Sequence, residues 1–369
     1  MSPPDAESIR SIHTKSAGEI VMKAAVYGGP GEIRVEDRPE PKLEDSTDAI
    51  VRVTHTAICG SDLWFYRGDD EPEVGSRVGH EPMGIVEEIG DDVRHVEPGD
   101  RVFAPFAISC GECEFCRKGL HTACTNGGFW APEGQNGGAQ AEKLRVPQAN
   151  GTLVRVPDRY ADNEEVLEAL LPLTDVMGTG HHAAVCANVT AGDTAVVIGD
   201  GAVGLCGVLA SKRLGAERII AVGHHENRLE LAEELGATDV VSSRGQEAID
   251  EVRELTHGGA NHVLECVGAE SALETTAAVV RPGGNIGYVG APHVEDPSFL
   301  QPLFFSNVSF TGGPAPTREY AEELMEDVLQ GTLDPSPIFT KTVTLDDVPE
   351  GYEAMDEREA IKTLVRIDE

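Results

Sequence analysis

One short segment restricts the fold of this chain more than any other: the glycine-rich turn GDGAVG at residues 199–204. An apolar run precedes the turn, and a segment with helical spacing follows it. In a strand–turn–helix of this pattern, the first glycine makes the tight turn, the second lets a pyrophosphate approach the backbone, and the third lets helix and strand pack closely. The helix N-terminus then presents free N–H groups to the phosphates. The segment predicts a dinucleotide site, and a purely structural turn is the alternative. The predicted contacts are Gly199, Asp200, Gly201, Ala202, Val203 and Gly204.

Strand-like and helix-like segments alternate from about residue 191 onward, within a cofactor-binding domain expected over residues 171–314. TAVVIG, RIIAVG, HVLECVG and GNIGYVG read as strands, and GLCGVLASKRLG and NRLELAEELG read as helices. This alternation predicts an α/β fold with a doubly wound parallel sheet of the Rossmann type. Residues from about 22 to 160 read instead as short strands broken by turn residues, and helical spacing begins near 164, which predicts a β-rich catalytic domain over residues 22–170. Residues 315–369 are expected to rejoin that domain, and residues 1–21 to form a polar tail.

The residues at the end of the second predicted strand bear on which dinucleotide binds. An acidic residue there would bind the ribose 2′-OH of NAD. Here the position holds Gly223, followed by His224, His225 and, three residues later, Arg228. A small residue with cationic or hydrogen-bond-donating neighbours suits a 2′-phosphate, so these residues favour NADP over NAD. Glu226 could instead contact the ribose or face solvent, and the histidines could be ordinary surface residues.

Four of the eight cysteines crowd into one short segment. Cys110, Cys113, Cys116 and Cys124 have the spacing C-x2-C-x2-C-x7-C. Four thiolates on one loop can surround a zinc ion tetrahedrally and leave no position open, which is typical of a structural site. Such a site would hold together a lobe at about residues 105–130 that has too few apolar residues to fold alone. An iron–sulfur cluster, free cysteines and a disulfide are the alternatives.

A second set of candidate ligands is dispersed along the chain. Cys59 lies in CGSD, His80 and Glu81 lie in GHE, and Asp175 lies in LTDVMGTG. Alone, such a histidine is more often a core residue, and such an aspartate is often a helix cap. Together with the cysteine lobe and the glycine turn, and in this order, they resemble the zinc-containing medium-chain dehydrogenase/reductase family. The resemblance covers about residues 22–369. It is greatest for the branch of glutathione-independent formaldehyde dehydrogenases and secondary alcohol dehydrogenases, which places an aspartate where Asp175 stands.

The resemblance implies a GroES-like catalytic domain beside the Rossmann domain, and it implies roles for the dispersed residues. Cys59, His80 and Asp175 would bind a catalytic zinc that keeps one position open for substrate. Glu81 would lie beside the metal and enter or leave its shell. Asp62 would orient the His80 ring.

The resemblance also implies how the alcohol and the cofactor are handled. Zinc would act as a Lewis acid, and Ser61 would receive the proton of the alcohol. In some members of the family a histidine passes this proton onward, but that position holds Trp64 here, so the relay beyond Ser61 is not identified. The nicotinamide end would meet Thr179, Val203, Val267 and the segment from Val289 to Ala291.

These features predict a zinc-dependent alcohol dehydrogenase that transfers hydride reversibly between a primary or secondary alcohol and NADP or NAD. Oxidation of polyols, sugars or formaldehyde would fit the same scaffold. A relative that binds the cofactor without catalysis is the alternative from another class, and a zinc-free quinone reductase is a third. The presence of all three predicted ligands of the catalytic zinc argues against both. One catalytic and one structural zinc per chain are expected, in a homodimer or homotetramer.

The charge of the chain bears on its surroundings and partners. Asp and Glu number 64 against 29 Lys and Arg, which gives a net charge of −35. The excess is dispersed, and concentrated salt screens such self-repulsion. The composition therefore indicates a salt-rich, haloarchaeal type of cytoplasm, with an ordinary acidic protein as the alternative. The sequence has no basic patch, so we do not expect it to bind nucleic acid. It has no export signal and no apolar run of roughly 20 residues, so we do not expect a membrane association. Small alcohols or aldehydes are the expected partners.

Overall fold

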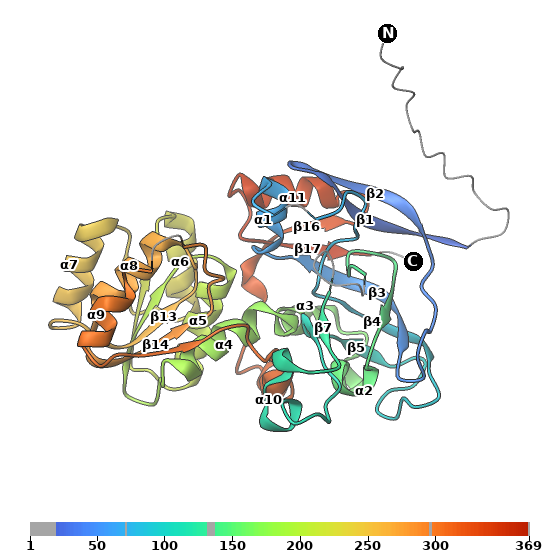
Figure 1. Cartoon of the computed structure of the whole chain (residues 1–369), viewed down its shortest axis with the longest axis horizontal. Coiled ribbons are helices and arrows are strands. Elements are labelled where there is room, and N and C mark those ends of the chain that lie inside the picture. Colours follow the sequence, from blue (N-terminus) through green and yellow to red (C-terminus); the bar gives the residue numbers. More distant parts are fainter. Residues whose placement is uncertain (1–19, 71, 131–136, 295–296, 368–369) are drawn as a thin grey trace, which may run out of the picture.

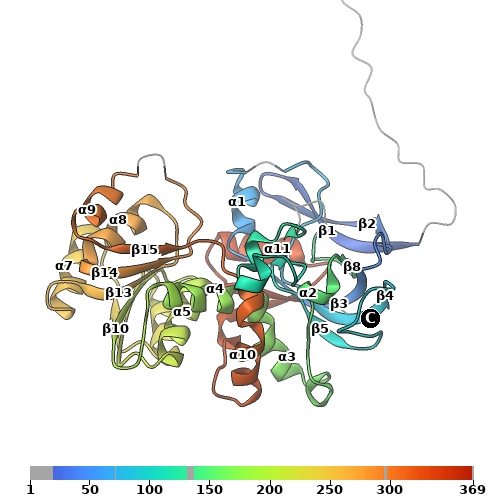
Figure 2. The ribbon, with the colours of Figure 1, turned by 60° about the horizontal axis from the view of Figure 1, so that its bottom comes forward.

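The structure, a computed structural model, describes residues 20–70, 72–130, 137–294 and 297–367. Nearly all of the predicted N-terminal tail therefore lies outside the described residues. The chain forms two lobes of different architecture (Figure 1). Helices α4 and α10 lie between the lobes in the view of Figure 2.

One lobe is built on a six-stranded parallel sheet with the strand order β12-β11-β10-β13-β14-β15. Its strands are β10 (Thr194–Ile198), β11 (Arg218–Val222), β12 (Asp239–Val241), β13 (Ala260–Glu265), β14 (Val280–Tyr288) and β15 (Ser309–Gly312). Its helices are α5 (Ala202–Arg213), α6 (Glu226–Leu235), α7 (Gly245–Leu255), α8 (Glu270–Val279) and α9 (Leu300–Phe305). The strand order reverses between β10 and β13, which is where ligands bind in doubly wound sheets. The predicted Rossmann sheet is confirmed.

The central strand β10 shows why this sheet takes helices on both faces. Its side chains alternate between two hydrophobic clusters, with Ala195 and Val197 in one and Val196 and Ile198 in the other. Because both faces of the strand are apolar, both must be covered. Helix α4 (Val176–Cys186) packs on α5 and on β14, and so joins this lobe to the rest of the chain.

The other lobe is built on a seven-stranded, mainly antiparallel sheet. Its order is β16-β17-β3-β4-β5-β9, with β8 also paired to β3. The strands are β3 (Ala49–Ile58), β4 (Met83–Ile89), β5 (Arg101–Phe103), β8 (Lys143–Val146), β9 (Val154–Arg155), β16 (Phe339–Thr344) and β17 (Lys362–Arg366). Strand β17 pairs antiparallel with β3, with Thr363 opposite Ile58. The C-terminal segment thereby completes the sheet that the N-terminal half begins.

Shorter elements surround this second sheet. Two hairpin-like pairs are β1 (Val21–Gly29) with β2 (Glu32–Pro39), and β6 (Ala107–Ile108) with β7 (Gly128–Phe129). The helices are α1 (Asp62–Arg67), α2 (Ala149–Thr152), α3 (Glu164–Leu170), α10 (Thr317–Leu329) and α11 (Val348–Asp356). The 3-10 helices are η1 (Cys116–Lys118), η2 (His121–Ala123), η3 (Asp158–Tyr160), η4 (Leu171–Thr174) and η5 (Ser336–Ile338). Among the described residues, no helix has the length and apolar character to cross a bilayer.

Candidate active site and metal centres

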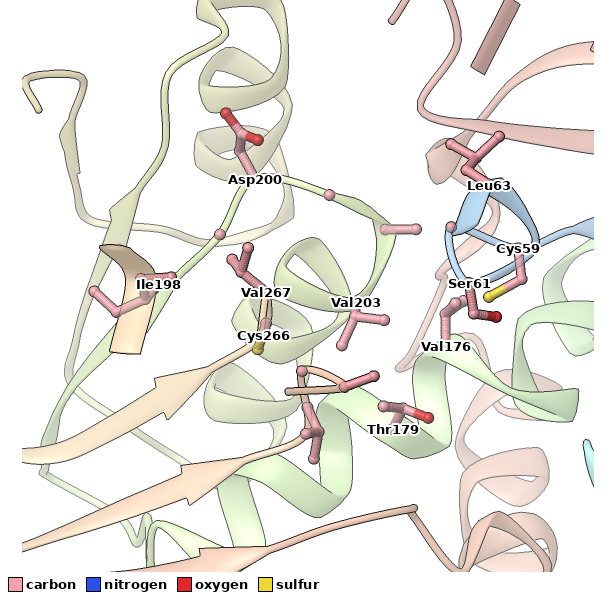
Figure 3. Close-up of a pocket in the computed structure, with 18 of the residues that line it drawn as sticks. Cys59, Ser61, Leu63, Val176, Thr179, Ile198, Asp200, Val203, Cys266 and Val267 are labelled. Atoms are coloured by element: carbon pink, nitrogen blue, oxygen red, sulfur yellow. The ribbon is translucent and has the colours of Figure 1, made fainter. Parts of the chain in front are cut away.

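A large cavity of about 1660 Å³ lies between the two lobes. One wall comes from the β-rich lobe, with residues 59–65 and His80, and the other from the carboxyl ends of β10, β11, β13 and β14. Figure 3 shows Cys59 and Ser61 on one side of this space and Asp200, Val203 and Val267 on the other. The cavity therefore brings the dispersed candidate ligands and the glycine turn to one site.

The three glycines of the turn occupy the positions that their predicted roles require. Gly199 has φ of +118°, a conformation that L side chains rarely adopt. A Cβ at Gly201 would meet nothing within 4 Å, so the backbone here is open to a ligand. A Cβ at Gly204 would lie 1.9 Å from the carbonyl oxygen of Gly199, so only glycine lets the helix approach the turn. Of the six residues 199–204, all but Gly204 line the cavity.

Asp200 points from the turn toward the end of β11. Its Oδ2 accepts hydrogen bonds from the backbone N–H groups of His224 at 2.6 Å and His225 at 3.0 Å, and it lies 2.9 Å from His225 Nδ1. Burial alone would raise the pKa of Asp200, but these hydrogen bonds outweigh it and the pKa is lowered. A Cβ at Gly223 would lie 2.6 Å from the same oxygen. The carboxylate of Asp200 thus fills the space beside Gly223.

The other residues predicted to contact the cofactor are also placed by the structure. His224, His225 and Arg228 line the cavity near Gly223, whereas Glu226 is exposed at the start of α6 and does not. At the opposite end, the lining includes every residue predicted for the nicotinamide: Thr179, Val203, Val267 and the segment from Val289 to Ala291. The Oγ1 of Thr179 donates to Asp175 Oδ1 at 2.9 Å, so this end of the cavity adjoins the dispersed ligand set.

The four cysteines of the lobe form a compact cluster with the dimensions of a tetrahedral thiolate site. The Sγ–Sγ distances are 3.5 Å for Cys110–Cys124, 3.5 Å for Cys113–Cys116 and 3.9 Å for Cys113–Cys124. Tetrahedral zinc with bonds of about 2.3 Å to sulfur requires Sγ–Sγ distances of about 3.8 Å, far longer than a disulfide. Backbone N–H groups of Cys116 and Thr125 lower the pKa of Cys113 to about 5. The cluster fits a closed zinc site.

Cys59, His80, Glu81 and Asp175 place one potential ligand atom each within 4.8 Å of one another. They come from the end of β3, from the loop before β4 and from the residue before α4. Asp175 Oδ2 is 3.1 Å from Cys59 Sγ and 3.2 Å from His80 Nε2. Sulfur, nitrogen and oxygen ligands of one tetrahedral zinc lie about 3.3–3.6 Å apart, slightly more than these distances, so the three are close enough to share one ion.

The environment of Cys59 and His80 supports the same conclusion. Among protein groups alone, burial and the Asp175 carboxylate raise the pKa of Cys59 to about 11, so a thiolate at neutral pH needs a cation beside it. Asp62, which is buried, places Oδ1 3.3 Å from His80 Nδ1 and accepts from the backbone N–H of Cys59 at 3.0 Å. This contact turns the Nε2 of His80 toward Asp175.

Asp175 occupies the N-cap position of α4, yet its side chain makes no capping hydrogen bond to the helix. Its two oxygens contact Thr179, Cys59 and His80 instead. The cap interpretation therefore does not account for this side chain, whereas a ligand interpretation does.

Sequence reasoning missed the partner of Glu81. Lys362 Nζ lies 2.6 Å from Glu81 Oε1, and both side chains are 0% exposed. Lys362 also donates to the carbonyl oxygen of Ile58 at 3.3 Å. Glu81 Oε1 is 4.0 Å from His80 Nε2, so the glutamate lies behind the other three ligands and is held by the lysine. The only sequence signal was a lysine at the start of the strand-like run KTLVRI.

Aromatic side chains form much of the cavity wall beside the ligand set. Leu63, Trp64 and Phe65 line the cavity, and the ring of Trp64 stacks on His293 from the other lobe, with centroids 3.5 Å apart. Phe106 and Phe129, which were not singled out, line it too and stack with centroids 6.0 Å apart. The wall of the catalytic end is therefore largely aromatic.

Comparison with known proteins agrees with this geometry. Residues 45–158 match the family model "Alcohol dehydrogenase GroES-like domain", and residues 202–330 match "Zinc-binding dehydrogenase". The chain is 33% identical over 377 residues to zinc-type alcohol dehydrogenase B of Aspergillus flavus, covering 100% of this chain and 85% of the relative. It is 35% identical over 380 residues to an uncharacterized zinc-type alcohol dehydrogenase-like protein of Bacillus subtilis, covering 94% and 100%.

A solved structure shows the same fold. Alcohol dehydrogenase TADH from Thermus sp. ATN1 superposes with a TM-score of 0.86 at 33% identity, covering 94% of this chain and 100% of that one. These matches confirm the predicted GroES-like domain beside a Rossmann domain, and the family implies zinc and NAD or NADP. The chain therefore belongs to the zinc-type medium-chain alcohol dehydrogenase family and is an oxidoreductase that acts on alcohols.

Proposed function

We propose that the enzyme oxidises primary or secondary alcohols that carry an apolar substituent, reversibly and with NADP as the favoured acceptor. The observation that carries the substrate class is the wall around the ligand set. It is lined by Leu63, Trp64, Phe106, Phe129, Trp130 and Val176. The indole N–H of Trp130 is already bonded to the carbonyl oxygen of Pro105 at 3.0 Å. Hydroxyl groups of a polyol or sugar would lose water against these faces without gaining partners, at about 1–3 kcal/mol each.

The chain's own residues divide the chemical work. Cys59, His80 and Asp175 would hold the metal, and Asp62 would keep the Nδ1 proton of His80 so that Nε2 faces the ligand position. Ser61, which lines the cavity beside Cys59, accepts the alcohol proton. When bound, zinc supplies a Lewis acid that lowers the pKa of the alcohol, and the nicotinamide supplies the hydride acceptor.

The proposed preference for NADP is supported by basic side chains at the adenosine end of the cavity. Arg228, Arg244 and Arg358 line it together with His224 and His225. In a chain with 29 basic against 64 acidic residues, three arginines at one end of one cavity are a local excess. Such a group suits the added charge of a 2′-phosphate.

We further propose that the protein is a cytoplasmic homodimer or homotetramer. Phe304 and Phe305 are 77% and 75% exposed, and they lie on α9, the helix that precedes the edge strand β15 in the chain. An apolar surface beside an open sheet edge favours association. Light scattering in molar salt that finds a monomer would contradict the oligomer.

The catalytic domain is proposed to comprise residues 22–170 and 315–369, and the cofactor domain residues 171–314. The pairing of β17 with β3 supports the return of the C-terminal segment to the catalytic domain.

The substrate proposal is tested with a panel of alcohols in molar salt. Benzyl alcohol and medium-length alkanols should give higher kcat/KM than sorbitol, glucose or formaldehyde, and NADP should give higher kcat/KM than NAD. A polyol or formaldehyde as the best substrate would contradict the proposed class. A higher kcat/KM with NAD would contradict the cofactor preference alone.

Two variants test the assigned roles. Asp175→Ala should lose the catalytic zinc and nearly all activity, whereas Ser61→Ala should keep both zinc ions and slow turnover by roughly 10²–10⁴-fold. Asn163→Ala is the matched control, because Asn163 caps α3 through a hydrogen bond from the backbone N–H of Val166 and lies away from the cavity. It should cost about 1 kcal/mol of stability and leave zinc content and kcat unchanged. If Asp175→Ala behaves like Asn163→Ala, Asp175 is not a ligand.

A further inference from the structure

The adenosine end of the cavity is built from both lobes. Arg358 follows α11 in the β-rich lobe, yet its Nη1 lies 3.2 Å from Nε2 of His225 in the Rossmann lobe. Arg358 also has φ of +64°, a conformation that is uncommon outside glycine. Both residues line the cavity.

The hydrogen-bond directions in this contact can be assigned from chemistry. A guanidinium group only donates, so His225 Nε2 is the acceptor and the ring proton is on Nδ1. Nδ1 then donates to Asp200 Oδ2 at 2.9 Å. Arg358, His225 and Asp200 therefore form one chain of hydrogen bonds that crosses from one lobe to the other.

A second arginine at the same place has capacity left for a ligand. Arg228 is 9% exposed, its Nη2 donates to the carbonyl oxygen of Ala360 at 3.3 Å, and its Nη1 is 4.0 Å from Asp200 Oδ1. Its buried Nε has no hydrogen-bond partner among the described residues. A buried donor without a partner costs free energy unless a ligand satisfies it.

Asp200 is arranged to hold this loop. Its Oδ2 is already engaged with two backbone N–H groups and one ring nitrogen, all from His224 and His225. The carboxylate therefore fixes the position and the tautomer of His225, which in turn fixes the Nη1 of Arg358.

We infer that Arg358 is a specificity-determining residue for the cofactor, a ligand for the 2′-phosphate contributed by the catalytic lobe, with Asp200 and His225 as its positioning residues. This inference rests on the proposed preference for NADP. A planar guanidinium with several donors suits a phosphate, and an exposed arginine held at one nitrogen keeps its other donors free. The phosphate would thereby bind across the two lobes.

The inference is tested with cofactor fragments, so that zinc and catalysis do not enter. Adenosine 2′,5′-bisphosphate and adenosine 5′-monophosphate are titrated calorimetrically at one fixed molar salt concentration. Arg358→Gln should raise the Kd of the bisphosphate about 10- to 100-fold and leave that of the monophosphate within about twofold. Arg358→Lys should give a smaller rise, because it keeps the charge and loses the fork. Asp200→Asn should also weaken the bisphosphate selectively. Gly223 is unsuitable as a test site, since a Cβ there would lie 2.5 Å from the Cβ of Asp200.

Arg159→Gln is the control for loss of one positive charge, because Arg159 is exposed and lies outside the cavity. It should change neither Kd. An unchanged bisphosphate Kd in Arg358→Gln, or an equal loss of affinity for both fragments, would overturn the inference. The NADP preference would stand in that case, provided that wild type still binds the bisphosphate more tightly than the monophosphate. Equal binding of both fragments by wild type would overturn the preference and the inference together. A loss of monophosphate binding in Asp200→Asn would show that Asp200 contacts the ribose itself and is not a positioning residue.

Discussion

Replacing Lys362 by methionine tests how the ligand set is supported from behind. The change keeps an unbranched side chain that is only one atom shorter, but it removes the cation that pairs with Glu81 at 2.6 Å. Among the described side chains, Glu81 would retain the Thr174 hydroxyl at 3.3 Å, and that hydroxyl also donates to the carbonyl oxygen of Leu171 at 2.6 Å. Both partners of the pair are 0% exposed, so water cannot replace the lysine. Breaking a buried pair from one side costs about 3–5 kcal/mol, which is a large share of a total stability of about 5–15 kcal/mol.

The assay is urea unfolding in molar salt with zinc held constant, followed by circular dichroism. Lys362→Met should lower the free energy of unfolding by about 3–5 kcal/mol, and the double variant Lys362→Met with Glu81→Gln should recover much of this loss. Lys23→Met is the matched control, because Lys23 pairs with Asp346 on the surface and should contribute nothing measurable. A loss below about 1 kcal/mol in Lys362→Met, or a double variant as unstable as the single, would refute the reasoning.

Three further predictions concern metal, salt and pH. Metal analysis should find about two zinc ions per chain. Cys113→Ser should lose one zinc ion and keep the zinc ion at Cys59, His80 and Asp175. A count near one in wild type, or iron in place of zinc, would contradict the two-site assignment. Dialysis into dilute buffer that contains zinc should abolish activity, because the net charge of −35 is then no longer screened. The Debye length is about 30 Å at 0.01 M salt and about 3 Å at 1 M. Lasting activity in the dilute buffer would contradict the salt requirement. Burial lowers the pKa of His181 to about 4. Between about pH 4 and 6.5 the unfolded chain therefore binds one proton that the folded chain does not. The free energy of unfolding should rise with pH across that window, by roughly 3 kcal/mol. In His181→Gln that rise should be smaller in unfolding curves recorded from pH 4.5 to 7, and an unchanged pH profile would show that His181 does not carry it.

The parts of the site that depend on short sequence spacings could be predicted from the sequence. The glycine turn and the cysteine lobe each lie within one continuous segment, so their local geometry follows from residue type and spacing. The structure places Gly201 at the open backbone and packs Gly204 against Gly199, as the turn pattern requires. Strands β12 and β15 were missed because they are only three and four residues long and carry little apolar pattern.

The parts that depend on distant pairing could not be predicted. Lys362 and Glu81 are 281 residues apart, and Arg358 and His225 are 133 apart. Their contacts are set by which strands pair and by how the lobes face each other, and no local spacing encodes either. Asp175 shows the same limit, because an N-cap and a metal ligand have the same sequence signature. Only the direction of its oxygens, toward Cys59 and His80, separates the two.

The position of Lys362 on β17 also sets an order of events during synthesis. The four cysteines from Cys110 to Cys124 leave the ribosome together, so the lobe can take up its metal while translation continues. The catalytic ligands emerge between Cys59 and Asp175, but the cation that neutralises Glu81 is translated nearly two hundred residues later and is placed only when β17 pairs with β3. Until then the carboxylate of Glu81 lacks the cation that pairs with it in the folded chain. The charge compensation of Glu81 is therefore completed late in folding, after the C-terminal strand has been inserted.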